Sequence, residues 1–302
     1  MMGKIFSPGK LLLTSEYFVL DGSLALAVPT RLGQDFFYEE IEDGNSLVYW
    51  EALHQNNPWL QVKINYKNWE ILETNLPEAA KFILKVLKNA QSLSSVKFNS
   101  DKTYHLKTNL QFPSDFGLGS SSTLMNNLAE WAEINPYELN EISLGGSGYD
   151  IAIAAEKSSL LYRTKPERFV QKVDFNPSFK DKIIFIHLNQ KQDSREGINL
   201  YKSKPKSEAL IKEFSEITEQ VLIAENISQF SDLMEEHEQK ISNFLGIPTA
   251  KEKYFKDYSG FIKSLGAWGG DFVMASKSGN FLRYFQSKNY NKIFEWSEII
   301  DS

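Results

Sequence analysis

Residues 113–123 read PSDFGLGSSST and run into STLMNNLAEWAEI at 122–134, whose apolar spacing predicts a helix. Glycines without side chains let a ligand approach the backbone closely. The free amides and dipole of a helix N-terminus attract anions, and serine hydroxyls can cap the helix, bind phosphate oxygens or reach a metal ion. Gly and Ser are also ordinary turn and capping residues. By itself the stretch therefore fits an anion-binding loop and a simple turn equally well.

The composition is that of a globular protein. The chain has 302 residues, of which 42% are hydrophobic and 24% charged, enough for one large domain or two ordinary ones. No apolar run approaches the roughly 18 residues that span a bilayer, and the first residues lack a signal-peptide pattern, so we expect a cytoplasmic protein without membrane contact. The absence of cysteine excludes disulfides and cysteine nucleophiles. The four histidines form no metal-ligand spacing.

The charge balance narrows the class of partner. Lys and Arg number 33 and Asp and Glu 39, giving a net charge of −6, which disfavours a general nucleic-acid binder. An acidic protein binds an anionic ligand locally, with backbone amides and a few chosen cations. We therefore expect no nucleic-acid partner, and any anionic ligand to be bound at a local site; the oligomeric state is left open.

Strand patterns dominate the first 72 residues and helical patterns the later ones. Residues 4–20 predict a strand, a turn at Pro8-Gly9 and a second apolar element, and residues 95–100 predict a short strand. Turn composition in DFNPSFKD at 174–181 marks the change of pattern. We accordingly predict an N-terminal domain over 1–178 and a C-terminal domain over 179–302.

Two further glycine-rich stretches resemble the first in composition. GSGYDIA at 146–152 puts Asp150 on a turn beside small residues, and SLGAWGGD at 264–271 ends on Asp271. A carboxylate on such a turn can orient or deprotonate an acceptor. Each stretch taken alone also fits an ordinary tight turn.

With SPGKLLLTSEYFVLDG at 7–22, these stretches resemble, in this order, the motifs of the GHMP kinases, which are ATP-dependent kinases of small molecules. The set extends over almost the whole chain and looks most like phosphomevalonate kinase, with mevalonate kinase next. The resemblance implies an α+β protein with an N-terminal α/β domain, a C-terminal ferredoxin-like domain and the active site between them. It also implies ATP, Mg²⁺ and a small acidic substrate, most simply phosphomevalonate or mevalonate.

The resemblance implies roles position by position. Asp150 matches the catalytic aspartate, Lys10 the lysine near the transferred phosphoryl group, and Ser121 the serine that binds magnesium. The positions matching the phosphate loop are Gly117, Leu118, Gly119, Ser120, Ser121 and Ser122. The positions matching the third-motif turn are Gly266, Gly269 and Gly270, and those near the substrate are Glu16 and Tyr17.

The sequence leaves the acceptor and its contacts open. Lys191 and Arg195 follow a predicted buried strand and are candidates for binding an acidic substrate, Arg195 through two parallel hydrogen bonds; a solvated loop explains both residues equally well. An alcohol acceptor needs a base or orienting group, which Asp150 can supply. An acceptor that is already a phosphate is ionised, and Asp150 then positions Lys10 or the substrate.

Some positions depart from the family pattern. Ser15 stands where glycine is usual. Trp268 stands where a small residue is usual, and its indole could narrow the substrate pocket or obstruct phosphate binding. A second magnesium carboxylate is not evident, since neither Glu138 nor Glu141 fits a motif. Two alternatives follow: a degenerate family member that binds nucleotide or metabolite without turnover, and a related ATP-dependent diphosphomevalonate decarboxylase, which the motifs fit less well.

Overall fold

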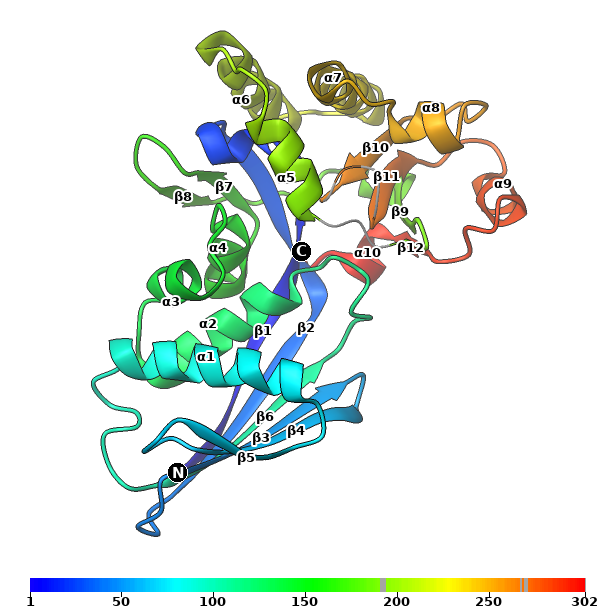
Figure 1. Ribbon diagram of the computed structural model, residues 1–302. Coiled ribbons are helices and arrows are strands. Elements are labelled where there is room, and N and C mark those ends of the chain that lie inside the picture. Colours follow the sequence, from blue (N-terminus) through cyan, green and yellow to red (C-terminus); the bar gives the residue numbers. More distant parts are fainter. Residues whose placement is uncertain (191–193, 267, 269–270, 302) are drawn as a thin grey trace. The chain divides into compact units, whose positions relative to one another are not determined.

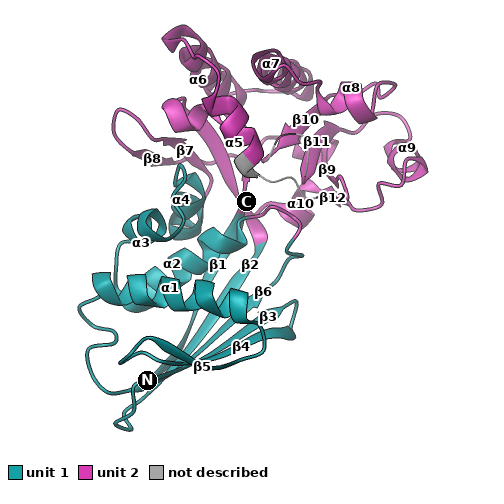
Figure 2. Ribbon diagram, viewed as in Figure 1, with its two compact units in different colours: residues 1–9, 32–114, 119–157 teal, residues 10–31, 115–118, 158–302 magenta. Residues whose placement is uncertain are grey.

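The computed structural model describes residues 1–190, 194–266, 268 and 271–301 (Figure 1). The chain forms two compact units, each discontinuous in sequence (Figure 2). Unit 1 comprises residues 1–9, 32–114 and 119–157, and unit 2 comprises residues 10–31, 115–118 and 158–302. Strands β1 (Met2–Leu12) and β2 (Ala25–Ile41) contribute to both units. A division of the domains at 178 and 179 stays a prediction.

Unit 1 is a sheet with helices packed on one face (Figure 1). Its strands follow the order β5-β4-β3-β6-β2, with only β3 and β6 parallel among these neighbours. The strands are β3 (Leu47–His54), β4 (Asn57–Asn65), β5 (Glu70–Thr74) and β6 (Thr103–Leu110). The helices are α1 (Pro77–Leu93), α2 (Ser120–Ala132), α3 (Pro136–Ser143) and α4 (Tyr149–Glu156).

Side-chain alternation decides which face of this sheet is covered. In β3, Val48 and Trp50 are buried, whereas Tyr49 between them is exposed, as the period of two in a strand requires. Helix α1 turns Ile83 and Val86 toward the same core, at the spacing of an amphipathic helix. The apolar face of the sheet and the apolar stripes of the helices therefore form one core.

Unit 2 contains a four-stranded antiparallel sheet in the order β10-β11-β9-β12. Its strands are β9 (Ile183–His187), β10 (Ile262–Leu265), β11 (Phe272–Ser276) and β12 (Ile293–Glu295). Between β9 and β10 run α5 (Ser194–Lys202), α6 (Glu208–Leu222), α7 (Ile227–Leu245) and α8 (Ala250–Tyr254), and α9 (Phe281–Ser287) lies between β11 and β12. This β-α-β-β-α-β succession is the ferredoxin-like arrangement, as expected.

The described part of unit 2 also contains two further strands and three short helices. The first half of β2 pairs with β7 (Leu160–Arg163), which pairs with β8 (Phe169–Lys172). Two 3₁₀ helices, η1 (Phe18–Asp21) and η2 (Lys180–Lys182), and helix α10 (Trp296–Ile299) are short. None of the helices described here is both long and apolar enough to cross a membrane.

Two expectations from the sequence are wrong. Strand β1 continues through Pro8 and Gly9 without a turn, because in the described residues it pairs with β2 alone and an edge strand tolerates proline. Residues 95–100 form bends instead of a strand. There the Ser94 hydroxyl accepts the amide of Lys97 at 3.0 Å, and Phe98 takes a left-handed φ of 63°. Such local side-chain bonds compete with strand pairing.

Candidate functional site

The second motif forms a loop that runs into helix α2 of unit 1. Gly119 is the N-cap residue with φ 87°, and its carbonyl accepts the amide of Thr123 at 3.0 Å. The Ser122 hydroxyl donates to the same carbonyl at 2.8 Å and so stabilises the first turn of α2. Ser120 is half-buried and Ser121 is exposed. An anion at this loop can accept hydrogen bonds from these two hydroxyls and from the amides of the first helical turn, which lack acceptors within the helix.

A pocket of about 430 Å³ adjoins Ser120 and Ser121 within unit 1. Its walls come from strands β3, β4 and β6 and helices α1 and α2. Its apolar lining residues are Trp50, Ala52, Trp59, Leu60, Ala79, Phe82, Ile83, Leu110 and Leu124, and its polar ones include Gln34, His54, Thr108 and Ser114. A mostly apolar wall with a few polar groups is typical of a small-molecule site.

Sequence reasoning missed the walls of this pocket. They come from segments that strand pairing and helix packing bring together, and their spacing in the chain carries no motif. The sequence offers one signal, because the large aromatic residue Trp59 directly follows two asparagines and a proline. In the structure its side chain remains 46% exposed. A large aromatic side chain left partly exposed at a concave site is a usual ligand contact.

In unit 2, Lys10 is bound to the residues that precede Gly119. Its amide donates to the Leu118 carbonyl and its Nζ to the Gly117 carbonyl, both at 3.0 Å. Gly117 has φ 66°, and a Cβ there would lie 2.2 Å from Oδ2 of Asp271. Only glycine fits such a position. The first, second and third motifs therefore meet within this unit, at Lys10, Gly117 and Asp271.

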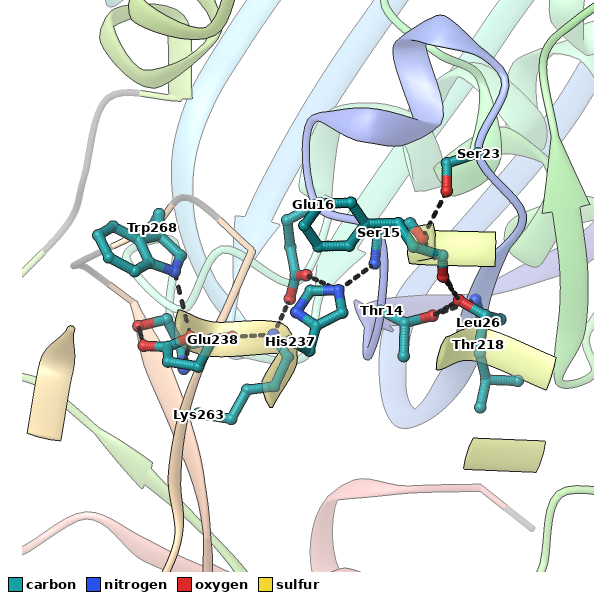
Figure 3. A network of polar contacts seen from close by, with 12 residues as sticks. Thr14, Ser15, Glu16, Ser23, Leu26, Thr218, His237, Glu238, Lys263 and Trp268 are labelled. Atoms are coloured by element: carbon teal, nitrogen blue, oxygen red, sulfur yellow. Dashed lines mark hydrogen bonds and ion pairs between the residues drawn. The ribbon is translucent and has the colours of Figure 1, made fainter. Parts of the chain in front are cut away.

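Glu16 belongs to a buried polar network of unit 2 (Figure 3). Its Oε1 lies 2.5 Å from Nζ of Lys263, and its Oε2 lies 3.5 Å from Nε2 of His237. Burial raises the pKa of Glu16, although the Lys263 ammonium opposes this. Burial, aided by Lys263, lowers the pKa of His237 well below its ordinary value. The imidazole is accordingly neutral, and its Nε2 accepts the Ser15 amide at 2.7 Å.

These bonds also explain the serine at a position where glycine is usual. Ser15 has φ 61°, in the left-handed region that favours glycine. Its amide is held by His237, and its hydroxyl donates to the Leu24 carbonyl at 2.6 Å. Tertiary hydrogen bonds thus maintain a backbone conformation that serine alone disfavours.

Trp268 is part of the core of unit 2. Its side chain is 5% exposed and packs in a cluster with Tyr17, Phe18, Tyr201, Phe214, Ile241 and Leu245. The indole N–H donates to Oε2 of Glu238 at 3.1 Å (Figure 3). The backbone amide donates to the Tyr17 hydroxyl at 3.1 Å. The side chain therefore fills core volume in this unit, and an effect of it on a substrate pocket stays a prediction.

The other predicted residues are distributed over both units. Asp150 is half-buried in the first turn of α4 in unit 1, and its Oδ1 accepts the amide of Ile151 at 3.1 Å. Gly266 of unit 2 has φ 72°. Joint action of Lys10, Ser121 and Asp150, and substrate contact by Glu16 and Tyr17, stay predictions. Lys191, Gly269, Gly270 and the side chain of Arg195 lie outside the described part of the chain.

The described residues contain no group of three or more His, Asp and Glu side chains that could hold a metal ion. Magnesium bound with a nucleotide takes most of its ligands from phosphates and water and only one or two from protein. The exposed Ser121 hydroxyl, at the helix N-terminus beside the pocket, fits such a single ligand.

No family model and no curated protein sequence matches the chain, but solved structures do. Mevalonate kinase of Methanococcus jannaschii aligns with a TM-score of 0.67 and 17% identity over 97% of this chain and 96% of that chain. Streptococcus pneumoniae phosphomevalonate kinase, in complex with phosphomevalonate and AMPPNP, gives 0.68 and 14% over 95% of both chains. A mevalonate diphosphate decarboxylase from Legionella pneumophila gives 0.57 and 16% over 97% of this chain and 100% of that chain.

The chain therefore has the two-domain α+β fold of the GHMP kinases, as the order of its motifs predicts. The two kinases that its motifs most resemble, mevalonate kinase and phosphomevalonate kinase, are among the solved structures with this fold.

Proposed function

We propose that the protein is an ATP- and magnesium-dependent kinase that transfers the γ-phosphoryl group to a small acidic metabolite, phosphomevalonate in the first place and mevalonate in the second. The observation that carries this proposal is the pocket of unit 1, which has an apolar aromatic wall and the N-terminus of α2 beside it. The wall suits a nucleobase, and the amides and hydroxyls suit a polyphosphate. The S. pneumoniae phosphomevalonate kinase with this fold was solved with AMPPNP.

Phosphoryl transfer depends on positioning and on neutralising charge on the transferring group. Lys10 suits the second task, because its ammonium is held by the Gly117 carbonyl and is shielded from solvent, with the residue only 9% exposed. Ser121 would hold magnesium together with phosphate and water oxygens. When bound, the ion would neutralise further phosphate charge.

Asp150 has a role that depends on the acceptor. For mevalonate, whose hydroxyl is a weak nucleophile at neutral pH, its carboxylate orients or removes the proton. For phosphomevalonate, whose phosphate is already ionised, Asp150 positions the acceptor or Lys10. The first turn of a helix after Gly148, where the Ile151 amide donates to Oδ1, is a favourable place for a negative charge in either case.

The test is ADP formation by purified protein with mevalonate, phosphomevalonate, homoserine and galactose in turn. We expect phosphomevalonate to give the highest kcat/KM. Asp150→Asn and Lys10→Ala should each lower turnover more than tenfold, which is over about 1.4 kcal/mol in the barrier. Asp101→Asn, which alters an exposed ion pair with Lys67, is the control. Turnover like that of the wild type in both variants would refute these roles.

The same preparation separates the two alternatives. A protein that only binds its ligands would show ligand-dependent thermal stabilisation without ADP formation on any acceptor. A decarboxylase would release carbon dioxide from mevalonate diphosphate together with ADP.

A further inference from the structure

The carboxylate of Glu238, on helix α7, holds Ser264 within β10 and, in the segment that follows this strand, Trp268. Figure 3 shows the contact between Glu238 and Trp268. Its Oε1 accepts the Ser264 hydroxyl at 2.8 Å, and its Oε2 accepts the Ser264 amide and the Trp268 indole N–H, each at 3.1 Å. The Ala250 amide is a fourth donor, at 3.4 Å from Oε1. The residue is almost fully buried.

The same segment ends at Asp271, which is fixed at the start of β11. Its amide donates to the Gln190 carbonyl at 3.2 Å, and its carbonyl accepts the Leu188 amide at 2.8 Å. Its φ is 39°, which few residues other than glycine adopt. Its carboxylate lies against the backbone of Gly117.

A series of contacts among the described residues of unit 2 joins Glu238 to Lys10. Glu238 holds Ser264 of β10, the next residue, Leu265, pairs with Phe272 of β11, and Phe272 follows Asp271 directly. Asp271 abuts Gly117, and the Gly117 carbonyl accepts Nζ of Lys10 at 3.0 Å. Glu238→Gln turns one of the two acceptor oxygens into an N–H₂ donor, so the two donors that meet that oxygen lose their acceptor, and the segment that carries them must then rearrange.

We propose that Glu238 is a positioning residue for Lys10, acting through the paired ends of β10 and β11, Asp271 and Gly117. Its kinetic consequence rests on the proposed function, because Lys10 matters to turnover only if phosphoryl transfer occurs. Its structural consequence does not, since mobility at Gly117 can be measured without any substrate.

Unit 1 offers a matched control. The Glu40 carboxylate is partly buried, with Lys97 Nζ at 2.5 Å and the Trp131 indole N–H at 3.2 Å from its Oε1. Glu40→Gln therefore removes a partly buried charge that also accepts an indole N–H, but on Trp131 of α2 and beside Lys97. If Glu238 served stability alone, Glu238→Gln and Glu40→Gln would both lower the melting temperature, and neither would change exchange at residues 113–119.

The experiment compares the full chain with Glu238→Gln, Trp268→Phe and Glu40→Gln by hydrogen–deuterium exchange and steady-state kinetics. We expect Glu238→Gln to raise exchange severalfold in peptides covering residues 262–276 and 113–119, and to lower kcat about tenfold while KM for ATP changes less than twofold. Trp268→Phe, which keeps a ring in the core, should change the same peptides less. Glu238→Asp should recover part of kcat. Glu40→Gln should lower the melting temperature and change neither peptide set.

Two results would overturn the proposal. One is increased exchange confined to residues 262–276, with 113–119 unchanged. The other is a less stable Glu238→Gln variant whose kcat equals that of the wild type. Absence of ADP formation by the wild type with every acceptor would refute the proposed function instead, and the exchange data would still decide whether Glu238 positions Gly117.

Discussion

Nζ of Lys10 lies 3.0 Å from the carbonyl oxygen of Gly117, a residue 107 positions further along the chain. The Lys10 amide binds the next carbonyl, that of Leu118. The lysine of the first motif is thus attached twice to the loop of the second. Its position consequently depends on the backbone conformation at Gly117.

Gly117→Ala should destabilise the protein by more than its left-handed φ alone explains. A left-handed alanine costs about 1–2 kcal/mol, and the new Cβ would also meet Oδ2 of Asp271 at 2.2 Å, which adds about 1–3 kcal/mol of overpacking. Gly44→Ala is the control, because Gly44 has φ 77° and a Cβ there would meet only open space. Urea denaturation measures the free energy of unfolding of the two variants and the wild type. An equal loss of stability in Gly117→Ala and Gly44→Ala would contradict the close approach of Asp271.

Ser121→Ala and Ser122→Ala should have separable effects. The exposed Ser121 hydroxyl is the proposed magnesium ligand, so its loss should raise the magnesium concentration for half-maximal ADP formation severalfold without a change in melting temperature. The Ser122 hydroxyl bonds the Gly119 carbonyl, so its loss should cost about 1 kcal/mol of stability and leave the magnesium requirement unchanged. The reverse pattern would exclude Ser121 as the ligand.

Trp59→Ala should weaken nucleotide binding. The side chain lines the pocket beside Ser120, and loss of an aromatic contact costs about 1 kcal/mol, equivalent to roughly a fivefold rise in Kd for an ATP analogue by calorimetry. Phe37→Ala is the control, since Phe37 lines a different groove on the sheet and is exposed to a similar degree, 36% against 46%. Similar affinities for the wild type and Trp59→Ala would place the nucleotide elsewhere.

His237→Gln should change how stability depends on pH. Because the pKa of His237 is lower in the folded state than the ordinary 6.5, its contribution to stability is present above pH 6.5 and is lost as the pH falls toward the folded pKa, by up to about 1.4 kcal/mol per pH unit. Glutamine keeps an acceptor for the Ser15 amide but does not titrate.

The measurement is the free energy of unfolding of both proteins from pH 7.5 to 5. The wild type should lose stability more steeply below pH 6.5 than His237→Gln. The raised pKa of Glu16 acts in the opposite sense, since that contribution is present at low pH and lost as the pH rises, and Glu16 is common to both proteins. Parallel curves would mean that His237 does not titrate as a buried neutral group.

Local patterns predicted much of the fold. The helical spacing over 77–93 corresponds to α1, and the glycine-serine stretch precedes α2 at Ser120. The apolar run at 183–187 likewise indicates strand β9, and amphipathic spacing indicates the helix pair α6 and α7. These features depend on a few consecutive residues, since amphipathic spacing, capping and positive φ are local properties. The bends at 95–100 were missed because one serine side chain outweighs strand propensity there.

The sequence alone determined which short stretches begin helices, and which glycine, serine, lysine and aspartate residues are suited to binding and transferring phosphate. Only the tertiary structure decided the partners of buried groups. Glu16 meets Lys263 from 247 positions away, Trp268 packs in a core built from four other segments, and Ser15 keeps a glycine-like backbone because His237 accepts its amide. The reason is physical: the energy of a buried charge or indole depends on the groups that packing brings around it, and those groups come from distant parts of the chain.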